Sequence, residues 1–359
     1  MIKAILYPLV DTIRAFNIFQ YISFRAAYAA VTALLISFLL GPWVIRKLAR
    51  LKLGQEIRSD GPETHLAKAG TPTMGGTLII IAFLISVVLW QEIAALYTWI
   101  ILITAVGLGL LGFADDFLKI SKKSSDGLRA GVKFTGQLVV SFLIMALIYA
   151  LRNDQTTLLY VPFFKNAVLD LGVLYIPFGM LLIVGMSNAV NLTDGLDGLA
   201  AGLVVIALMA FTVLAYLTGH SEFARYLFIP FLSGAGELTI SAAALVGACV
   251  GFLWFNTHPA EVMMGDTGSL TLGGLLAVFA LLLKKEILLL IIGGVFVMET
   301  LSVIIQVAGF KRTGRRVFKM APLHHHFELS GWAESKVVAR FWILGGMFAI
   351  LGLSTLKIQ

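Results

Sequence analysis

The sequence predicts an all-α, polytopic integral membrane protein with about ten transmembrane helices. Hydrophobic residues make up 59% of its 359 residues and charged residues only 13%, whereas soluble domains carry about 25% charged residues. The apolar residues also gather into runs of about 20, the length that crosses the hydrocarbon layer of a bilayer. There is therefore too little polar surface to cover a water-soluble domain of this size.

Ten apolar runs are the candidate spans. They lie at approximately 22–46, 73–90, 96–114, 134–151, 171–188, 196–218, 237–256, 268–283, 286–310 and 337–357. The connections are too short for a soluble domain, so residues 1–359 are expected to form a single transmembrane domain. The first twenty residues are expected to form a short interfacial helix. No internal repeat is visible, which argues mildly against transporters built from duplicated halves.

Lysine and arginine residues are concentrated in the connections after the first, third and ninth runs. Because basic loops are retained on the cytoplasmic side, the odd-numbered connections are expected to be cytoplasmic and both termini periplasmic. Basic loops beside an anionic leaflet also explain the net charge of +7 without a nucleic-acid partner. The same loops could equally hold an anionic substrate.

The first candidate site group is the pair Asp115-Asp116, which closes the third run. Adjacent carboxylates repel each other unless a cation neutralises them. Acidic residues at a helix C-terminus oppose the helix dipole, so stability alone does not explain them. Lys119, Lys122 and Lys123 follow, which suits a site for a metal ion and phosphates. Solvated charges at a helix end are the alternative.

The second group consists of polar residues spaced by three: Asn188, Asn191, Asp194 and Asp197. On a helix this spacing places all four along one broad stripe. Thr193 or Asp194 could instead cap the following helix, but capping explains one residue and not four. Gly195 and Gly198 allow a backbone or a ligand to approach closely.

The third group is Asp266, at the start of the eighth run. A carboxylate at a helix N-terminus is electrostatically favourable, so capping is a serious alternative. The flanking Gly265 and Gly268 favour a phosphate or metal site.

The fourth group is His324-His325-His326. Consecutive residues point about 100° apart on a helix and to opposite faces on a strand, so all three cannot bind one ion in regular structure. Contact with phosphate, hydrogen bonding to a sugar or proton transfer is the favoured role. The isolated His65, His220 and His258 are expected to be ordinary loop residues.

Two further features are open to two interpretations each. Glu299 and Gln306 share one face of the ninth run, where they either join helices or line a groove. The segment 68–76, which includes Lys68 and Thr73, has the glycine and threonine content of an anion-binding turn. It could equally be a plain turn into the second run.

Together, carboxylates and lysines on the expected cytoplasmic side indicate a divalent metal ion and a phosphorylated substrate. Mg²⁺ prefers carboxylate and phosphate oxygens, and it would neutralise a pyrophosphate and stabilise a departing nucleotide monophosphate. The sequence contains no Walker-type glycine loop, which disfavours an ATP-driven pump. It also lacks a cysteine and histidine pattern for structural zinc.

These motifs closely resemble a known enzyme family. They are GTPTMGG at 70–76, GFADDF at 112–117, NAVNLTDGLDGLA at 188–200, GFLWFN at 251–256, MGDTGSL at 264–270 and APLHHHFEL at 321–329. Over nearly all its length the chain resembles the polyprenyl-phosphate N-acetylhexosamine-1-phosphate transferases. The triple histidine segment is typical of their muramoyl-pentapeptide branch. Ala114 departs from the family pattern, but no charged site residue is missing.

The resemblance implies a reaction and a location. Phospho-N-acetylmuramoyl-pentapeptide would pass from UDP-MurNAc-pentapeptide to undecaprenyl phosphate, giving lipid I and UMP, with Mg²⁺ as cofactor. This is the first membrane step of peptidoglycan synthesis. The implied enzyme is a homodimer in the bacterial inner membrane, with its active site on the cytoplasmic face and an interrupted ninth helix.

The resemblance also implies roles for individual residues. Asp266 is the first candidate metal ligand, and Asp115 and Asp116 lie beside the diphosphate as further candidates. The implied phosphate, nucleotide and metal-site contacts are Lys68, Thr73, Lys119, Lys123, Lys133, Asn188, Asn191, Asp194 and Asp197. The implied contacts to the sugar-phosphate region are His324, His325 and His326.

Two other functions compete with this one. Within the family, the donor could be UDP-N-acetylglucosamine, although the HHHFEL segment argues against it. From a different class, the chain could be a transporter or flippase for an anionic lipid. A transporter is expected to place its polar residues near the bilayer midplane, whereas here they gather at one side. For the transfer itself, direct attack is favoured over an aspartyl-phosphate because a lipid phosphate is already anionic near neutral pH.

Overall fold

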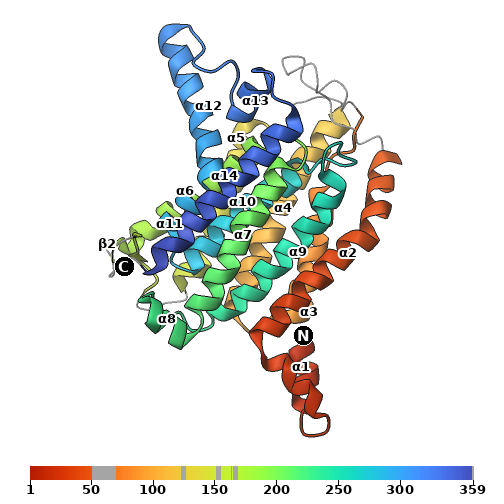
Figure 1. The fold of residues 1–359 in the computed structure, drawn as a ribbon, viewed down its shortest axis with the longest axis vertical. Helices are drawn as coiled ribbons and strands as arrows, with labels where there is room; N and C mark the ends of the chain where they lie inside the picture. Colours follow the sequence, from red (N-terminus) through yellow and green to blue (C-terminus); the bar gives the residue numbers. More distant parts are fainter. Residues whose placement is uncertain (51–69, 123–126, 151–154, 163, 165–168, 358–359) are drawn as a thin grey trace.

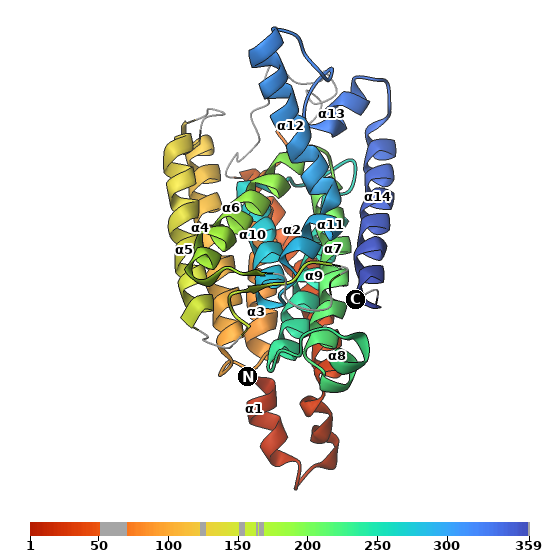
Figure 2. The ribbon, with the colours of Figure 1, turned by 90° about the vertical axis from the view of Figure 1, so that its left-hand side faces the viewer.

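The computed structural model is a bundle of helices with one short two-stranded sheet (Figures 1 and 2). It describes all residues except 51–69, 123–126, 151–154, 163, 165–168 and 358–359. The helices are α1 (Ile2–Leu6), α2 (Ile22–Arg50), α3 (Gly76–Trp90), α4 (Leu96–Lys122), α5 (Ala130–Ala150), α6 (Tyr175–Thr193), α7 (Leu199–Thr218), α8 (Ser221–Leu227), α9 (Leu238–Asn256), α10 (Gly265–Leu282), α11 (Glu286–Ile292), α12 (Gly294–Thr313), α13 (Leu323–Glu328) and α14 (Glu334–Ser354). Strands β1 (Leu158–Leu159) and β2 (Leu169–Asp170) pair antiparallel.

The all-α membrane class is confirmed. Within the described residues, nine helical segments are long and apolar enough to cross a membrane, and α3 is a shorter apolar helix of 15 residues. The ninth predicted run forms two helices, α11 and α12, which meet at Gly293. The family resemblance implies an interrupted ninth helix and matches its outward-leaning extension to the basic segment 311–319. The structure breaks the run earlier, at Gly293, and α12 leans away from the bundle beyond that point (Figure 1). The first twenty residues form three short helical pieces instead of one helix.

Helix α10 lies at the centre of the bundle, and 94% of its 18 residues are buried. Glycines allow its neighbours to approach its backbone closely. A Cβ atom at Gly112 of α4 would overlap the carbonyl of Asp266, and one at Gly76 of α3 would overlap Gly268. Small residues at helix contacts are the usual way for membrane helices to pack closely. The α4–α10 contact therefore brings Asp115 and Asp116 next to the first turn of α10.

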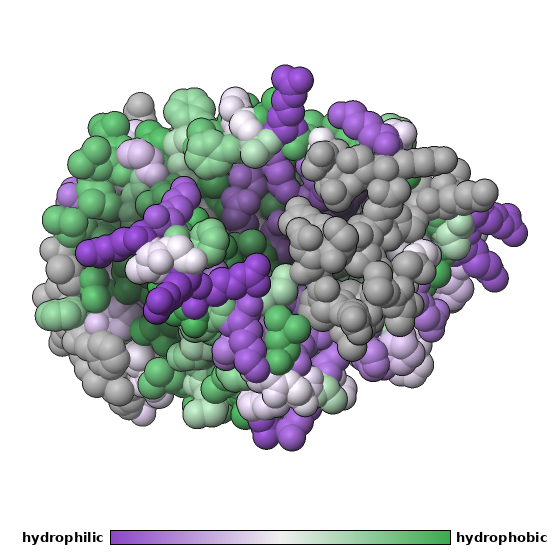
Figure 3. Space-filling model, turned by 90° about the horizontal axis from the view of Figure 1, so that it is seen from above, coloured by the Kyte–Doolittle hydropathy of each residue, from purple (hydrophilic) through white to green (hydrophobic). Residues whose placement is uncertain are grey.

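Polar residues gather at the end of the bundle where α4 and α6 finish and α10 begins. Helices α12 and α13 rise above this end, whereas α1 projects from the opposite end (Figures 1 and 2). Seen from above, hydrophilic residues surround a recess in this face (Figure 3). The basic residues Lys311, Arg312, Arg315 and Arg316 are exposed at the end of α12 and just beyond it. This end of the molecule therefore combines buried acids with exposed bases.

Candidate functional site

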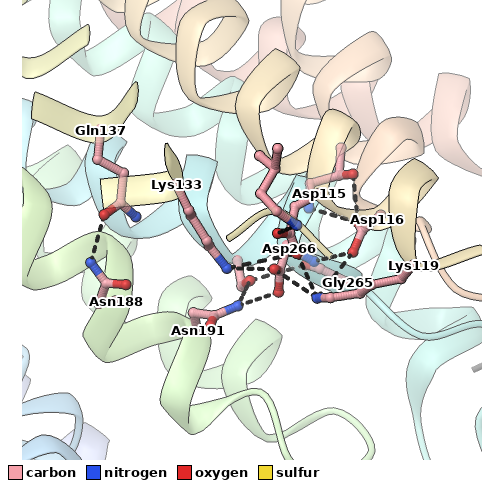
Figure 4. A network of polar contacts seen from close by, with 12 residues as sticks. Asp115, Asp116, Lys119, Lys133, Gln137, Asn188, Asn191, Gly265 and Asp266 are labelled. Carbon is pink, nitrogen blue, oxygen red and sulfur yellow. Dashed lines mark hydrogen bonds and ion pairs between the residues drawn. The ribbon is translucent and has the colours of Figure 1, made fainter. Parts of the chain in front are cut away.

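Three buried carboxylates meet between α4 and α10. Asp115, Asp116 and Asp266 are 2%, 2% and 8% exposed, and one oxygen from each lies within 4.8 Å of the others. Figure 4 shows them pointing toward one another from the two helices. Three carboxylates so close together need cations beside them, because buried like charges are costly. This acidic cluster is the strongest candidate metal site in the described part of the chain.

Asp116 connects α4 to the N-terminus of α10. Its Oδ1 accepts the backbone N–H of Asp266 at 3.0 Å, and its Oδ2 accepts the backbone N–H and the hydroxyl of Thr267 at 2.9 and 2.7 Å. The first N–H groups of a helix have no partner within the helix, and a carboxylate is a favourable acceptor for them. Asp116 therefore caps a neighbouring helix, and both of its oxygens are already engaged.

The expected position of the aspartate pair at a helix end is wrong. Helix α4 continues to Lys122, so Asp115 and Asp116 lie inside it. The argument from the dipole of their own helix does not apply. These carboxylates are stabilised instead by the start of α10 and by a loop, where the N–H of Leu128 donates to Oδ1 of Asp115 at 2.9 Å.

Two lysines supply the positive charge in the acidic cluster. Lys119 Nζ lies 2.6 Å from Oδ2 of Asp115 and 2.9 Å from Oδ2 of Asp266. Lys133 Nζ lies 2.5 Å from the same oxygen of Asp266 and 3.8 Å from Asp115. The two ammonium groups therefore occupy the space where a cation bridging Asp115 and Asp266 would bind.

The two asparagines predicted for the site have different surroundings. Asn191 donates to Oδ1 of Asp266 at 2.6 Å and to the hydroxyl of Ser269 at 2.8 Å. Asn188 donates instead to Gln137 and to the carbonyl of Val184, at 3.0 and 2.8 Å. Figure 4 shows this second pair beside the acidic cluster but directed away from it. Only Asn191 is joined directly to the carboxylates.

The expectation of a single helical stripe for Asn188, Asn191, Asp194 and Asp197 is wrong, because α6 ends at Thr193. Asp194 and Asp197 lie in the connection to α7, which we call the 194–198 loop. Burial, together with the neighbouring carboxylates of Asp266, Asp116 and Asp197, raises the pKa of Asp194 to about 8. The neighbouring carboxylates therefore favour the protonated form of this group beside the acidic cluster.

Asp197 belongs to a second group, which His258 and Glu334 complete. Oδ2 of Asp197 lies 3.1 Å from Nδ1 of His258 and accepts the N–H of Ala260 at 3.1 Å. Glu334, in the first turn of α14, accepts the backbone N–H of Asp197 at 2.9 Å. The interpretation of His258 as an ordinary loop residue is therefore wrong. These contacts join the 194–198 loop to α14 and to the connection before α10.

The three histidines of α13 point to different partners. His324 is fully buried beside Glu299, with 3.3 Å between Nδ1 and Oε2. Nδ1 of His325 lies 2.9 Å from Glu328, and Nδ1 of His326 accepts the N–H of Lys319 at 3.1 Å. The clusters of side chains that could hold a metal ion in the described residues do not include His324, His325 or His326. This agrees with the argument that consecutive histidines do not share one ion.

The segment before α3 runs beside the start of α10. Pro72 accepts the N–H of Met263 at 2.7 Å, and Gly75 donates to the carbonyl of Met263 at 2.8 Å. A Cβ atom at Gly265 would lie 2.9 Å from the hydroxyl of Thr73 and 2.6 Å from Asp116. Gly265 also has a positive φ of 74°, which favours glycine. Thr73 is therefore close to the acidic cluster, whereas Lys68 and Lys123 lie outside the described residues.

Sequence reasoning missed several residues around the site. Thr267 donates to Asp116, and Ser269 accepts from Asn191. Asn256 accepts the N–H of Gly198 at 3.1 Å and donates to the carbonyl of Val262 at 2.9 Å. Thr267 and Ser269 follow Asp266 in the MGDTGSL motif, and that position was the available signal. Asn256 ends an apolar helix, where its role depends on a distant loop.

The chain is similar to known proteins along its whole length. The model of glycosyl transferase family 4 matches residues 98–284, and phospho-N-acetylmuramoyl-pentapeptide-transferase signature 1 matches residues 68–80. The chain is 52% identical to the phospho-N-acetylmuramoyl-pentapeptide-transferase of Syntrophus aciditrophicus, over 100% of both chains. It is 51% identical to the enzyme of that name from Thermodesulfovibrio yellowstonii, also over 100% of both. It is 53% identical to the enzyme of that name from Desulforapulum autotrophicum, over 99% of both chains.

Proposed function

The chain belongs to the phospho-N-acetylmuramoyl-pentapeptide-transferase family, and from this we infer its reaction. It is a transferase that moves phospho-N-acetylmuramoyl-pentapeptide from its UDP donor to undecaprenyl phosphate. The products are lipid I and UMP. We propose that the reaction takes place at the acidic cluster of Asp115, Asp116 and Asp266. The observation that supports this is the convergence of these three carboxylates with Lys119 and Lys133.

We propose that Mg²⁺ is the cofactor and that Asp266 and Asp115 hold it. The residues fit such an ion because three buried carboxylates converge there, and within the described part of the chain the positive charges that face them are the ammonium groups of Lys119 and Lys133. Bound there, Mg²⁺ would neutralise the diphosphate of the donor and the charge on the departing UMP. Asp116 contributes by fixing the first turn of α10, and Asn191 orients the Asp266 carboxylate through Oδ1.

The two lysines have a second role in this proposal. With a divalent cation bound to the carboxylates, Lys119 and Lys133 would be free to donate to the phosphate oxygens of the substrate. Each ammonium group donates charge-assisted hydrogen bonds, which are the stronger class. Asp194, whose pKa is raised by burial and by these carboxylates, lies on the same side. Nucleotide contacts are assigned to the 194–198 loop and to Lys68, Lys123 and Thr73.

We propose direct attack by an oxygen of undecaprenyl phosphate on the β-phosphorus of the donor. The new bond joins the lipid oxygen to that phosphorus, and the bond to the α-phosphate breaks, so UMP leaves with the electron pair. Asp116 is poorly suited to act as a covalent nucleophile because both of its oxygens hold the N-terminus of α10. Isolation of a phosphorylated Asp115 or Asp116 during turnover would overturn direct attack.

The chain is a multi-pass bacterial membrane protein. We propose that it lies in the inner membrane as a homodimer, with residues 1–359 forming one catalytic domain. The basic residues at the α12 end support a cytoplasmic position for the acidic cluster, and hence periplasmic termini. A protease accessibility assay on oriented vesicles tests this, because cleavage near Arg315 from the periplasmic side would contradict it.

A donor assay with the purified protein tests the function. The protein is given undecaprenyl phosphate and Mg²⁺ with either UDP-MurNAc-pentapeptide or UDP-N-acetylglucosamine, and UMP release and the lipid product are measured. Product from the muramoyl donor alone is expected. Product only from UDP-N-acetylglucosamine would identify the other branch of the family, and transport without UMP release would identify a transporter.

A further inference from the structure

A fully buried carboxylate lies inside the spanning helix α12. Glu299 has 0% exposure, as does His324, which lies beside it. An ionisable group within a membrane span is costly and is usually paired and functional. Among the described residues, the titratable side chain that faces the Glu299 carboxylate is His324. The reason for a carboxylate at this position is therefore to be sought in that histidine.

Both carboxylate oxygens of Glu299 face His324. Oε1 accepts the backbone N–H of His324 at 3.2 Å, and Oε2 lies 3.3 Å from the ring nitrogen Nδ1. A carboxylate behind an imidazole selects the tautomer that carries its proton on the nearer nitrogen. In that tautomer Nδ1 is the donor, and Nε2 is left as the acceptor on the other edge of the ring.

That other edge of the ring faces the 194–198 loop. A Cβ atom placed on Gly195 would overlap Nε2 of His324, so only a glycine leaves room for the ring. Both ring nitrogens are buried, and no hydrogen bond to either is found among the described residues; Nδ1 faces Oε2 of Glu299 at 3.3 Å, whereas Nε2 faces Gly195 of the loop. The imidazole is thus held between a carboxylate of α12 and the loop that carries Asp194 and Asp197.

Helix α12 also holds the chain that leads to the histidines. Two turns beyond Glu299, the side-chain oxygen of Gln306 accepts the N–H groups of Val317 and Phe318 at 3.0 and 2.9 Å. Its amide donates to the carbonyl of Phe318 at 3.1 Å. Glu299 and Gln306 therefore both connect α12 to the segment that carries the histidines. Of the two, Glu299 is the one that contacts a histidine ring.

We propose that Glu299 is a positioning residue for His324. By accepting Nδ1–H it turns Nε2 toward the 194–198 loop, so that the buried ring packs against Gly195 and holds the loop that carries Asp194 and Asp197 where the donor binds. This inference rests on the proposed function for the identity of the ligand, but the ring orientation and tautomer do not depend on it. Glu299 itself touches no substrate in this scheme.

The tautomer of His324 is the direct test. The full-length protein is labelled with ¹⁵N-histidine, and His324→Ala identifies the resonance. We expect Nδ1 to be protonated in the unchanged protein and a mixture of tautomers in Glu299→Gln, since glutamine offers one acceptor oxygen in place of two. An Nε2-protonated ring in the unchanged protein, or an unaltered tautomer in Glu299→Gln, would overturn the proposal. This readout requires no turnover, so it is separate from failure of the proposed function.

Kinetics supply the second test. Glu299→Gln is expected to lower kcat about 10–100-fold, the usual effect of removing a group that orients an active-site ligand. Binding of Mn²⁺ at the acidic cluster, followed by electron paramagnetic resonance, is expected to stay unchanged. Glu222→Gln is the matched control, since Glu222 is exposed and pairs with Arg225 on α8. An unchanged kcat in Glu299→Gln would contradict the positioning role.

Gly195→Ala displaces the same ring from its other side. The added methyl group overlaps Nε2, while the glycine's φ lies outside the left-handed region, so an alanine fits the backbone. We expect a comparable loss of kcat and a double variant little worse than either single one, because both act on one side chain. Fully additive losses would overturn the proposal. If Glu299→Gln fails to fold, Gly195→Ala and its tautomer spectrum still decide the question.

Discussion

Two buried clusters of charged side chains lie near opposite ends of the bundle, and they differ in whether their positive and negative charges are equal in number. Near the N-terminal end, Arg25 and Glu237 form a one-to-one pair with two hydrogen bonds of 2.8 and 2.6 Å. The acidic cluster at the other end sets three carboxylates against two lysines. A matched bidentate pair satisfies its own charge and serves the fold. A cluster with surplus acid favours the binding of a further cation, which makes it the candidate place for chemistry.

The largest expected effect concerns the carboxylate shared by both lysines. Asp266→Asn is expected to lower turnover about 1,000-fold, roughly 4 kcal/mol of transition-state stabilisation, because the metal loses its first ligand. UMP release measures this, and Mn²⁺ binding is expected to disappear with it. The thermal unfolding midpoint should be preserved. Near-normal activity would show that Asp266 is not a metal ligand. The acidic cluster would then serve the fold, as the pair of Arg25 and Glu237 does.

Breaking the balanced pair is expected to affect stability and not chemistry. Arg25→Met leaves Glu237 buried without its counterion, which costs about 3 kcal/mol of unfolding free energy. Unfolding in a denaturing detergent measures the loss. The folded fraction should turn over at the normal rate, and the double variant Arg25→Met/Glu237→Leu should recover much of the stability. A catalytic defect in the folded single variant would show that the pair is more than structural.

Removing one lysine should increase the imbalance of the acidic cluster. Lys133→Met is expected to lower turnover about 10–100-fold, since a charge-assisted contact contributes roughly 1.5–3 kcal/mol. Mn²⁺ should bind more tightly, because the incoming ion no longer displaces an ammonium group from Asp266. Titration followed by electron paramagnetic resonance gives the affinity. Weaker Mn²⁺ binding would mean that Lys133 increases the affinity of the site for the metal ion. It would contradict the idea that its ammonium group occupies the position of the ion.

The smallest effect is expected at the residue directed away from the acidic cluster. Asn188→Ala removes a hydrogen bond to Gln137, worth about 1 kcal/mol of stability. Turnover should fall less than about 5-fold, whereas Asn191→Ala, at the contact with Asp266, should lose considerably more. Measuring the two alanine variants side by side checks this. Equal losses would place Asn188 within the substrate site after all.

Much of the site was predictable because its residues stand out from an apolar background. Asp115, Asp116 and Asp266 are acids near span ends on the expected cytoplasmic side, and the structure brings them together. The surroundings of each were not predictable. Asp116 caps a helix that begins 150 residues later, and His258 meets Asp197 across 61 positions. Such pairs depend on which helices touch, and local sequence patterns do not carry that information.

By itself the sequence determined the membrane class, the approximate spans and the types of side chain available for chemistry, because hydropathy and charge act locally along the chain. Only the tertiary structure decided how those side chains combine. Close packing at Gly112 sets α4 against α10, and this contact brings separate aspartates together into a candidate cation site. Likewise, the buried contact between α12 and α13 pairs Glu299 with His324. Charge balance in a buried cluster depends on distances between helices, and these distances exist only in the folded chain.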